Sequence, residues 1–169
     1  GANTAVGQEA LTSNTTGYSN TAIGGGGVLD ACTTGHSNTG SGLAALSELT
    51  TGVQNTAYGV YAGLYIGSGS YNTLLGYQAG AYQTNLDTGT QCNFIGAYTK
   101  PSASNGTHQS VIGYNVAAYG NSTLTVGETT NDSYLSYGGT SWSTISDRRY
   151  KKDIEDAEAG FYEARDPEA

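Results

Sequence analysis

The sequence has little charge, few cysteines and no long apolar run, and each shortage excludes a class of protein. It holds six Lys and Arg against fourteen Asp and Glu, giving a formal net charge of −8. This balance argues against a nucleic-acid partner, because phosphate binding requires clustered basic side chains. No apolar segment approaches the roughly 18 residues that span a bilayer, so no membrane insertion is expected.

Metal and cofactor sites are also not expected. Cys32 and Cys92 stand far apart and neither has a CxxC partner, which argues against a zinc site. The two thiols are predicted to be free and partly buried, with a bridge within the chain or between subunits as the alternative. His36 and His108 are isolated, so neither is predicted to bind a metal ion.

What the sequence does have is a repeat of the form Asn-Thr-x-x-Gly. Five clear copies are followed by two degenerate ones that end at Gly96 and Gly113. The clear copies are Asn3–Gly7, Asn20–Gly24, Asn38–Gly42, Asn55–Gly59 and Asn72–Gly76. Successive motif glycines, the last residue of each copy, are 17, 18, 17, 17, 20 and 17 residues apart. A fixed step of this size across most of a chain indicates a stack of small repeating units.

Each unit predicts two short β segments, one before the motif glycine and one around a small residue three places after it, such as Ala45 or Ala62. Gly, Thr, Asn and Ser dominate the unit, which disfavours a helix. The fold class is therefore all-β. A stack of such thin coils is expected to leave an apolar stripe uncovered, formed by Leu11, Leu29, Leu46, Leu64 and Leu74 or Leu75. Chains with so small a core need partners, so we expect a homo-oligomer.

The distribution of charge divides the chain. Seven of its twenty charged residues precede residue 146 and thirteen follow. We therefore expect a repeat shaft over residues 1–120, a β-structured neck over 121–146 and a different segment over 147–169. In the last, Ile154, Ala157, Phe161 and Ala164 recur at helical spacing, which predicts a short C-terminal helix.

The segment Ser146–Ile154, of sequence SDRRYKKDI, resembles the start of the intramolecular chaperone domain of phage tail spikes and fibres of the endosialidase type. Tyr150 stands where that family usually has Leu. The resemblance implies chaperone-driven trimerisation followed by self-cleavage between Ser146 and Asp147, with Ser146 as nucleophile and Lys151 as its base. Such a pair is chemically consistent, because a serine hydroxyl needs a nearby base and a buried lysine can accept a proton. Apart from this single-turnover step, no enzyme activity is expected.

The repeats are also similar to coils in the heads of trimeric autotransporter adhesins and in phage fibres. Together the two resemblances imply a trimeric β-roll or β-helix fibre, the structural and receptor-binding part of an extracellular virion tail fibre. Its partners would be two further copies of the chain and a host surface glycan or protein, bound through three weak sites. The candidate contacts are loop residues: Tyr82, Asn85, Lys100, His108 and Tyr119.

Other functions remain open. The fibre could belong to a bacterial surface adhesin, or be a spacer without a binding site. Threonines at a regular step, beginning with Thr15 and Thr33, fit a surface that templates ice. A polysaccharide-cleaving spike is disfavoured, because glycosidases need two carboxylates a defined distance apart and the repeats hold only scattered single acids.

Overall fold

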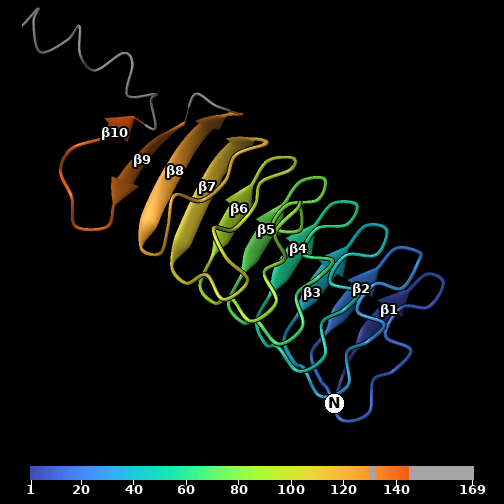
Figure 1. Ribbon diagram of the computed structural model, residues 1–169. Coiled ribbons are helices and arrows are strands. Elements are labelled where there is room, and N and C mark those ends of the chain that lie inside the picture. The colour runs from blue at the N-terminus through green and yellow to red at the C-terminus, as the bar shows by residue number, and fades with distance from the viewer. Residues whose placement is uncertain (130–131, 145–169) are drawn as a thin grey trace, which may run out of the picture.

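The computed structural model describes residues 1–129 and 132–144, and all regular structure in these residues is β. Ten strands form one sheet in sequence order (Figure 1). They are β1 (Thr4–Val6), β2 (Thr21–Ile23), β3 (Thr39–Ser41), β4 (Thr56–Tyr58), β5 (Thr73–Leu75), β6 (Asn93–Ile95), β7 (Gln109–Tyr114), β8 (Thr123–Glu128), β9 (Ser133–Ser136) and β10 (Ser143–Thr144). The expected all-β fold is confirmed, while the expected helix over 147–169 lies outside the described residues.

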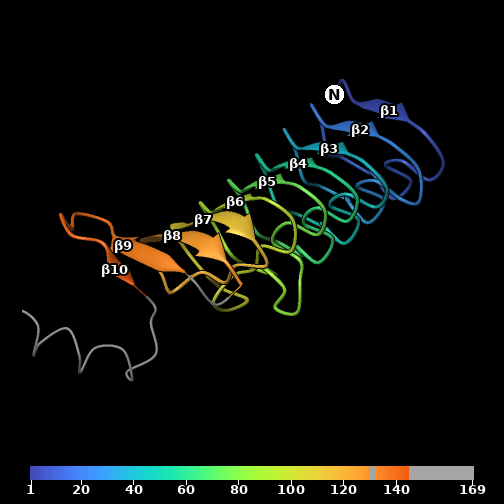
Figure 2. The same cartoon turned by 90° about the horizontal axis from the view of Figure 1, so that it is seen from above.

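Strands β1 to β8 pair in parallel, and the chain returns behind the sheet between one strand and the next (Figure 2). This is a β-solenoid, in which each coil places its strand beside the strand of the preceding coil. Equivalent residues lie opposite one another, so Thr21 faces Thr39 and Thr39 faces Thr56. The predicted repeat β-helix is therefore confirmed.

The end of the stack has a different topology. Strand β8, within the expected neck, still pairs in parallel with β7. Strands β9 and β10 then turn back and pair antiparallel. Because an uncovered strand edge is a template for further pairing, the antiparallel strands cover the edge that β8 would otherwise present.

The expectation of two strands per coil is wrong. The segments around Ala45 and Ala62 form turns, and only isolated bridges such as Ser70 to Thr90 lie outside the named strands. The alanines themselves are fully buried. Residues on this side of the coil repeatedly adopt left-handed backbone angles, as at Leu46 with φ of 53°, and such angles interrupt an extended strand.

The motif glycine ends each short strand. Gly59 has φ of +132°, a region that residues with a side chain rarely adopt. A Cβ atom on Gly59 would lie 2.6 Å from the carbonyl oxygen of Gly76 in the next coil. Glycine therefore provides both the backbone angle and the close approach of successive coils.

A ladder of buried asparagines runs along the stack beside the sheet. Its buried members are Asn20, Asn38, Asn55 and Asn72, and the exposed Asn3 stands at its first end; each is the first residue of a clear motif. The Nδ2 of Asn55 donates to Asn38 Oδ1 at 3.1 Å and to the Gly69 carbonyl at 2.9 Å. Its Oδ1 accepts from the backbone N–H of Asn72 at 3.0 Å. The same pattern links each coil to the next, so these amides satisfy the hydrogen-bonding groups that the narrow interior buries.

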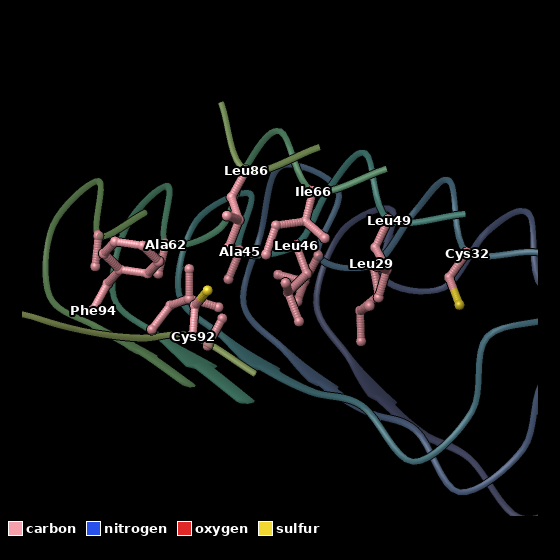
Figure 3. Close-up of a cluster of buried hydrophobic side chains, with 14 of the residues drawn as sticks. Leu29, Cys32, Ala45, Leu46, Leu49, Ala62, Ile66, Leu86, Cys92 and Phe94 are labelled. Atoms are coloured by element: carbon pink, nitrogen blue, oxygen red, sulfur yellow. The ribbon is translucent and has the colours of Figure 1, made fainter. Parts of the chain in front are cut away.

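The core is a continuous column of small and medium apolar side chains (Figure 3). Strands β2 to β6 contribute their middle residues and β7 contributes the equivalent residue: Ala22, Gly40, Ala57, Leu74, Phe94 and Val111. The turns behind the sheet contribute the others, among them Leu29, Leu46, Leu49, Ile66 and Leu86. Phe94 is the largest fully buried side chain, so the interior is wider in the coil of β6 than in the first coils.

The predicted open leucine stripe is therefore wrong. Leu11, Leu29, Leu46 and Leu74 lie in the core, and Leu64 is half-buried. Leu11, Leu29 and Leu46 adopt φ between 52° and 55°, in turns that close over the column. Of the residues named for that stripe, only Leu75 is exposed.

Both cysteines are free, as predicted, and they are fully rather than partly buried. Cys92 occupies the place in its coil that asparagine holds in the ladder, and its backbone N–H donates to Asn72 Oδ1 at 3.0 Å. Cys32 lies in a different row of the core, at the far end of the column in Figure 3. Burial raises the pKa of both thiols, which keeps them in the unreactive protonated form at neutral pH.

Candidate functional site

The outer face of the parallel sheet carries two regular rows, and strands β1 to β7 contribute no charged side chain to it. The first residue of each three-residue strand and Ser110, its counterpart in β7, form a threonine row: Thr4, Thr21, Thr39, Thr56 and Thr73, continued by Asn93 and Ser110. The third residue of each three-residue strand and its counterparts in β7 and β8 form an apolar row, interrupted only by Ser41: Val6, Ile23, Tyr58, Leu75, Ile95, Ile112 and Val126.

The side chains of the apolar row are between 36% and 63% exposed. Parallel sheets are normally covered on both faces, and an apolar surface that runs the length of a molecule indicates an interaction site. The sheet thus has an uncovered apolar stripe, as the sequence was expected to leave, but of the residues named for that stripe only Leu75 belongs to it.

A second surface feature begins where the strands end. Tyr61, Tyr77, Tyr98 and Tyr114 come from four successive coils and form a tyrosine row. Adjacent ring centroids lie 6.2, 5.1 and 5.8 Å apart, with interplanar angles of 68°, 80° and 85°. These are edge-to-face contacts, the arrangement that aromatic rings favour.

Two of the five predicted contact residues join this row. The ring of Tyr82 lies 4.8 Å from that of Tyr98, and Lys100 Nζ lies 5.3 Å from the centroid of Tyr82. Lys100 Nζ also donates to Gln83 Oε1 at 2.9 Å. Tyr82 and Gln83 belong to the loop between β5 and β6, in the longest step of the repeat, and this loop projects from the stack (Figure 2).

The other predicted contacts are dispersed. Asn85 is exposed on the loop between β5 and β6. His108 directly precedes β7, so it lies at the edge where strands begin, whereas the tyrosine row lies where they end. Tyr119 stacks on Tyr134 at a centroid distance of 3.6 Å, and a hydrogen bond to Tyr134 is the main cause that raises the pKa of Tyr119. In the sequence, His108 comes before a strand, whereas the other predicted contact residues come after one. This difference would have separated His108 from them.

Few charged side chains lie near the tyrosine row. Lys100 is the one Lys or Arg among residues 1–129 and 132–144. It attracts Asp132, although burial is the larger influence and raises the pKa of the Asp132 carboxyl. Glu128 lies opposite Tyr114 in the sheet register. Desolvation, and then the neighbouring tyrosines, raise the pKa of Tyr98, so its phenol is uncharged at neutral pH.

The predicted self-cleavage residues Ser146, Asp147 and Lys151 lie outside the described residues. Within the described ranges, no three His, Cys, Asp or Glu side chains gather as metal ligands would. The part of the chain that the structure describes also contains no helix long and apolar enough to cross a membrane. Comparison of the chain with protein-family models, curated proteins and solved structures found no match.

Proposed function

We propose that this chain is the structural and receptor-binding part of a homotrimeric phage tail fibre. The observation that carries the proposal is the apolar row on the outer face of the sheet, which extends from Val6 in β1 to Val126 in β8 and has Glu128 as the one charged side chain at its end. A surface of this kind needs a cover along its whole length. Another copy of the same chain has the same coil spacing, so its apolar row matches coil for coil.

Threefold assembly is supported by the sequence rather than by the coil geometry. Three copies arranged around one axis would direct each apolar row inward and leave the remaining surface of every chain accessible. The resemblance of Ser146–Ile154 to a trimerising phage chaperone favours three copies over two. In the same proposal, Ser146 attacks the peptide bond to Asp147 after assembly, and Lys151 accepts the hydroxyl proton.

Substitution in the apolar row tests the assembly. We expect the wild-type chain to sediment as a trimer, and Leu75→Asp combined with Ile112→Asp to dissociate it, because six buried charges would be brought together at the axis. The control is Tyr71→Asp, at a tyrosine that is 54% exposed and lies outside the row. If the double variant fails to fold, disulfide trapping of Leu75→Cys in the intact assembly answers the same question. A wild-type chain that is monomeric at micromolar concentration would refute the proposal.

Maturation is tested separately. The mass of the full-length product should show a cut after Ser146 in the wild type and none in Ser146→Ala. A cut would favour the phage fibre over a fibre-like bacterial surface adhesin, the alternative that the repeats equally suggest. If the chain forms a trimer but binds no ligand, its remaining function would be that of a spacer shaft.

The threonine row favours one further candidate, a surface that orders water. Thr4, Thr21, Thr39, Thr56 and Thr73 project in register from a parallel sheet. Thr33, one of the threonines that the sequence suggested for this role, is engaged elsewhere, since its Oγ1 donates to the Thr50 carbonyl. Thermal hysteresis from a monomer would support this candidate, and its absence would exclude it. The face cannot serve both as a trimer interface and as an ice surface.

A further inference from the structure

We propose that the tyrosine row, with Tyr82, Gln83 and Lys100 beside it, binds a neutral polysaccharide. This inference deepens the proposed function, because it assigns the receptor-binding surface of the fibre and the chemical class of its ligand. It is tested by glycan binding, whereas the fibre proposal is tested by oligomeric state, so either can fail without the other.

The row offers an aromatic surface of the kind that sugar rings pack against. Tyr77 and Tyr114 remain 40% and 50% exposed although both contact neighbouring tyrosines. Tyr61 and Tyr98 are the second residue after the motif glycine, and Tyr77 and Tyr114 are the first. This alternation of position accounts for the alternating planes of the rings. The surface extends over four coils, so it suits an extended chain of sugars better than a single one.

The coil itself does not require these rings. The position of Tyr61 and Tyr98, second after the motif glycine, is occupied by Gln78 and Asn115 in other coils. Its backbone is left-handed in all four cases, with φ between 52° and 59°. Asparagine tolerates this conformation better than tyrosine does. The backbone at this position accepts Gln and Asn as well as Tyr, so the coil does not require the rings there, and they are available for a role beyond the stacking of coils.

Polar groups flank the aromatic surface on the side of the projecting loop. Lys100 Nζ uses one hydrogen bond on Gln83 Oε1 and has further donors for ligand hydroxyls. Gln83 is exposed, and its amide adds a donor at the same place. An aromatic platform with a few polar groups at its edge is the usual composition of a site that orients a ligand.

The charges favour a neutral ligand over an acidic one. Lys100 is the only Lys or Arg of the described residues, and the carboxylate of Asp132 lies within its electrostatic influence. Glu128, opposite Tyr114, places a second acid at the end of the row. A polysaccharide of uronic acids would meet two carboxylates with the single charge of Lys100 to offset them.

The experiment uses the full chain on a printed array of bacterial surface polysaccharides, both neutral and uronate-containing. We expect retention on neutral polysaccharides, and Tyr98→Asn to weaken it about tenfold by removing the ring at the centre of the row. The matched control is Tyr71→Asn, since Tyr71 is exposed, has φ of 62° and lies outside the row. Circular dichroism and sedimentation check that both variants keep the fold and assembly of the wild type.

A second variant tests the ligand class. Lys100→Gln keeps a hydrogen-bond donor but removes the charge, so binding of a neutral polysaccharide should be insensitive to salt in both the wild type and this variant. Failure to retain any neutral polysaccharide, binding to uronates alone, or equal losses in Tyr98→Asn and Tyr71→Asn would each overturn the proposal.

Discussion

At the scale of single residues, the asparagine ladder is the clearest link from sequence to stability. A buried amide is costly unless its donors and acceptor are paired, and here each side chain pairs with the coil on one side and with the backbone on the other. Asn38 Oδ1 accepts from both the backbone and the side-chain nitrogen of Asn55. The ladder therefore joins adjacent coils independently of the sheet.

Replacing one member should break this continuity. Asn55→Ala removes the partners of the Gly69 carbonyl and of the Asn72 backbone N–H, both within the ladder. We expect a loss of about 2–4 kcal/mol in the free energy of unfolding, measured by urea denaturation. The control Asn85→Ala changes an exposed loop asparagine and should have almost no effect. Equal stability of the two variants would contradict the role of the ladder.

The motif glycine gives a second prediction at this scale. Gly59→Ala places a Cβ atom 2.6 Å from the Gly76 carbonyl at a backbone φ of +132°. The strain should cost about 1–3 kcal/mol, seen as a lower thermal midpoint. Gly25→Ala is the matched control, since no atom lies within 4 Å of its added Cβ. A Gly59→Ala protein as stable as Gly25→Ala would show that coils can separate without cost.

At the scale of the element, each strand is only three residues long over most of the stack, so adjacent residues have opposite roles. In β5, Leu74 is 1% exposed and Leu75 is 47% exposed. The middle residue of the strand faces the narrow column, and the residues on either side face outward. Two leucines adjacent in sequence thus serve the core and the outer surface separately.

Truncating these two leucines should separate folding from association. Leu74→Ala should destabilise the folded chain by about 2–5 kcal/mol, because it leaves a cavity in the core. Leu75→Ala should leave the stability of the single chain nearly unchanged and shift the association midpoint of the proposed trimer to higher protein concentration. Unfolding followed at several concentrations distinguishes the two effects. The expectation fails if both variants show the same concentration dependence.

The strands also show how far the sequence could predict this fold. The spacing of motif glycines predicted a stack of paired coils, because a fixed step brings equivalent residues side by side. It did not reveal which way a three-residue strand faces. The narrow interior of the early coils accepts Ala22 and Gly40, which turns Ile23 outward, whereas hydrophobicity alone would have placed Ile23 inside. The recurring motif asparagine could have indicated the ladder.

The candidate site was predictable only in part. Tyr82 and Lys100 were both identified as loop residues, and the structure brings them together. The tyrosine row was visible as an aromatic-rich region, but alternation between two positions after the motif glycine hides its regularity in the sequence. The edge-to-face contacts depend on where successive coils lie, which motif spacing alone does not specify.

At the scale of the whole molecule, stability is distributed along the stack, since each coil contacts mainly its two neighbours. Equivalent residues remain in register from β1 to β7 although the steps between motif glycines vary, because the extra residues of longer coils lie in loops. The length of the shaft is therefore set by the number of coils, at about 4.8 Å for each.

Removing one complete coil tests this modularity. Deletion of residues 39–55 joins Asn38 to Thr56, so Thr56 takes the place of Thr39 opposite Thr21. We expect a folded, shorter protein with the same circular dichroism spectrum per residue and a smaller urea m-value, because less surface is exposed on unfolding. Its apolar row stays continuous, with Tyr58 beside Ile23, so the shorter chain should still assemble.

The matched control is a smaller deletion, of residues 47–54. It joins Leu46 to Asn55 and leaves about half a coil between Gly42 and Gly59, too short to pass behind the core and return to the sheet. The larger deletion should therefore be tolerated and the smaller one should abolish cooperative unfolding. A similar loss of structure in both would mean that the coils are not interchangeable units, and that the length of this shaft could not have changed by gain or loss of whole coils.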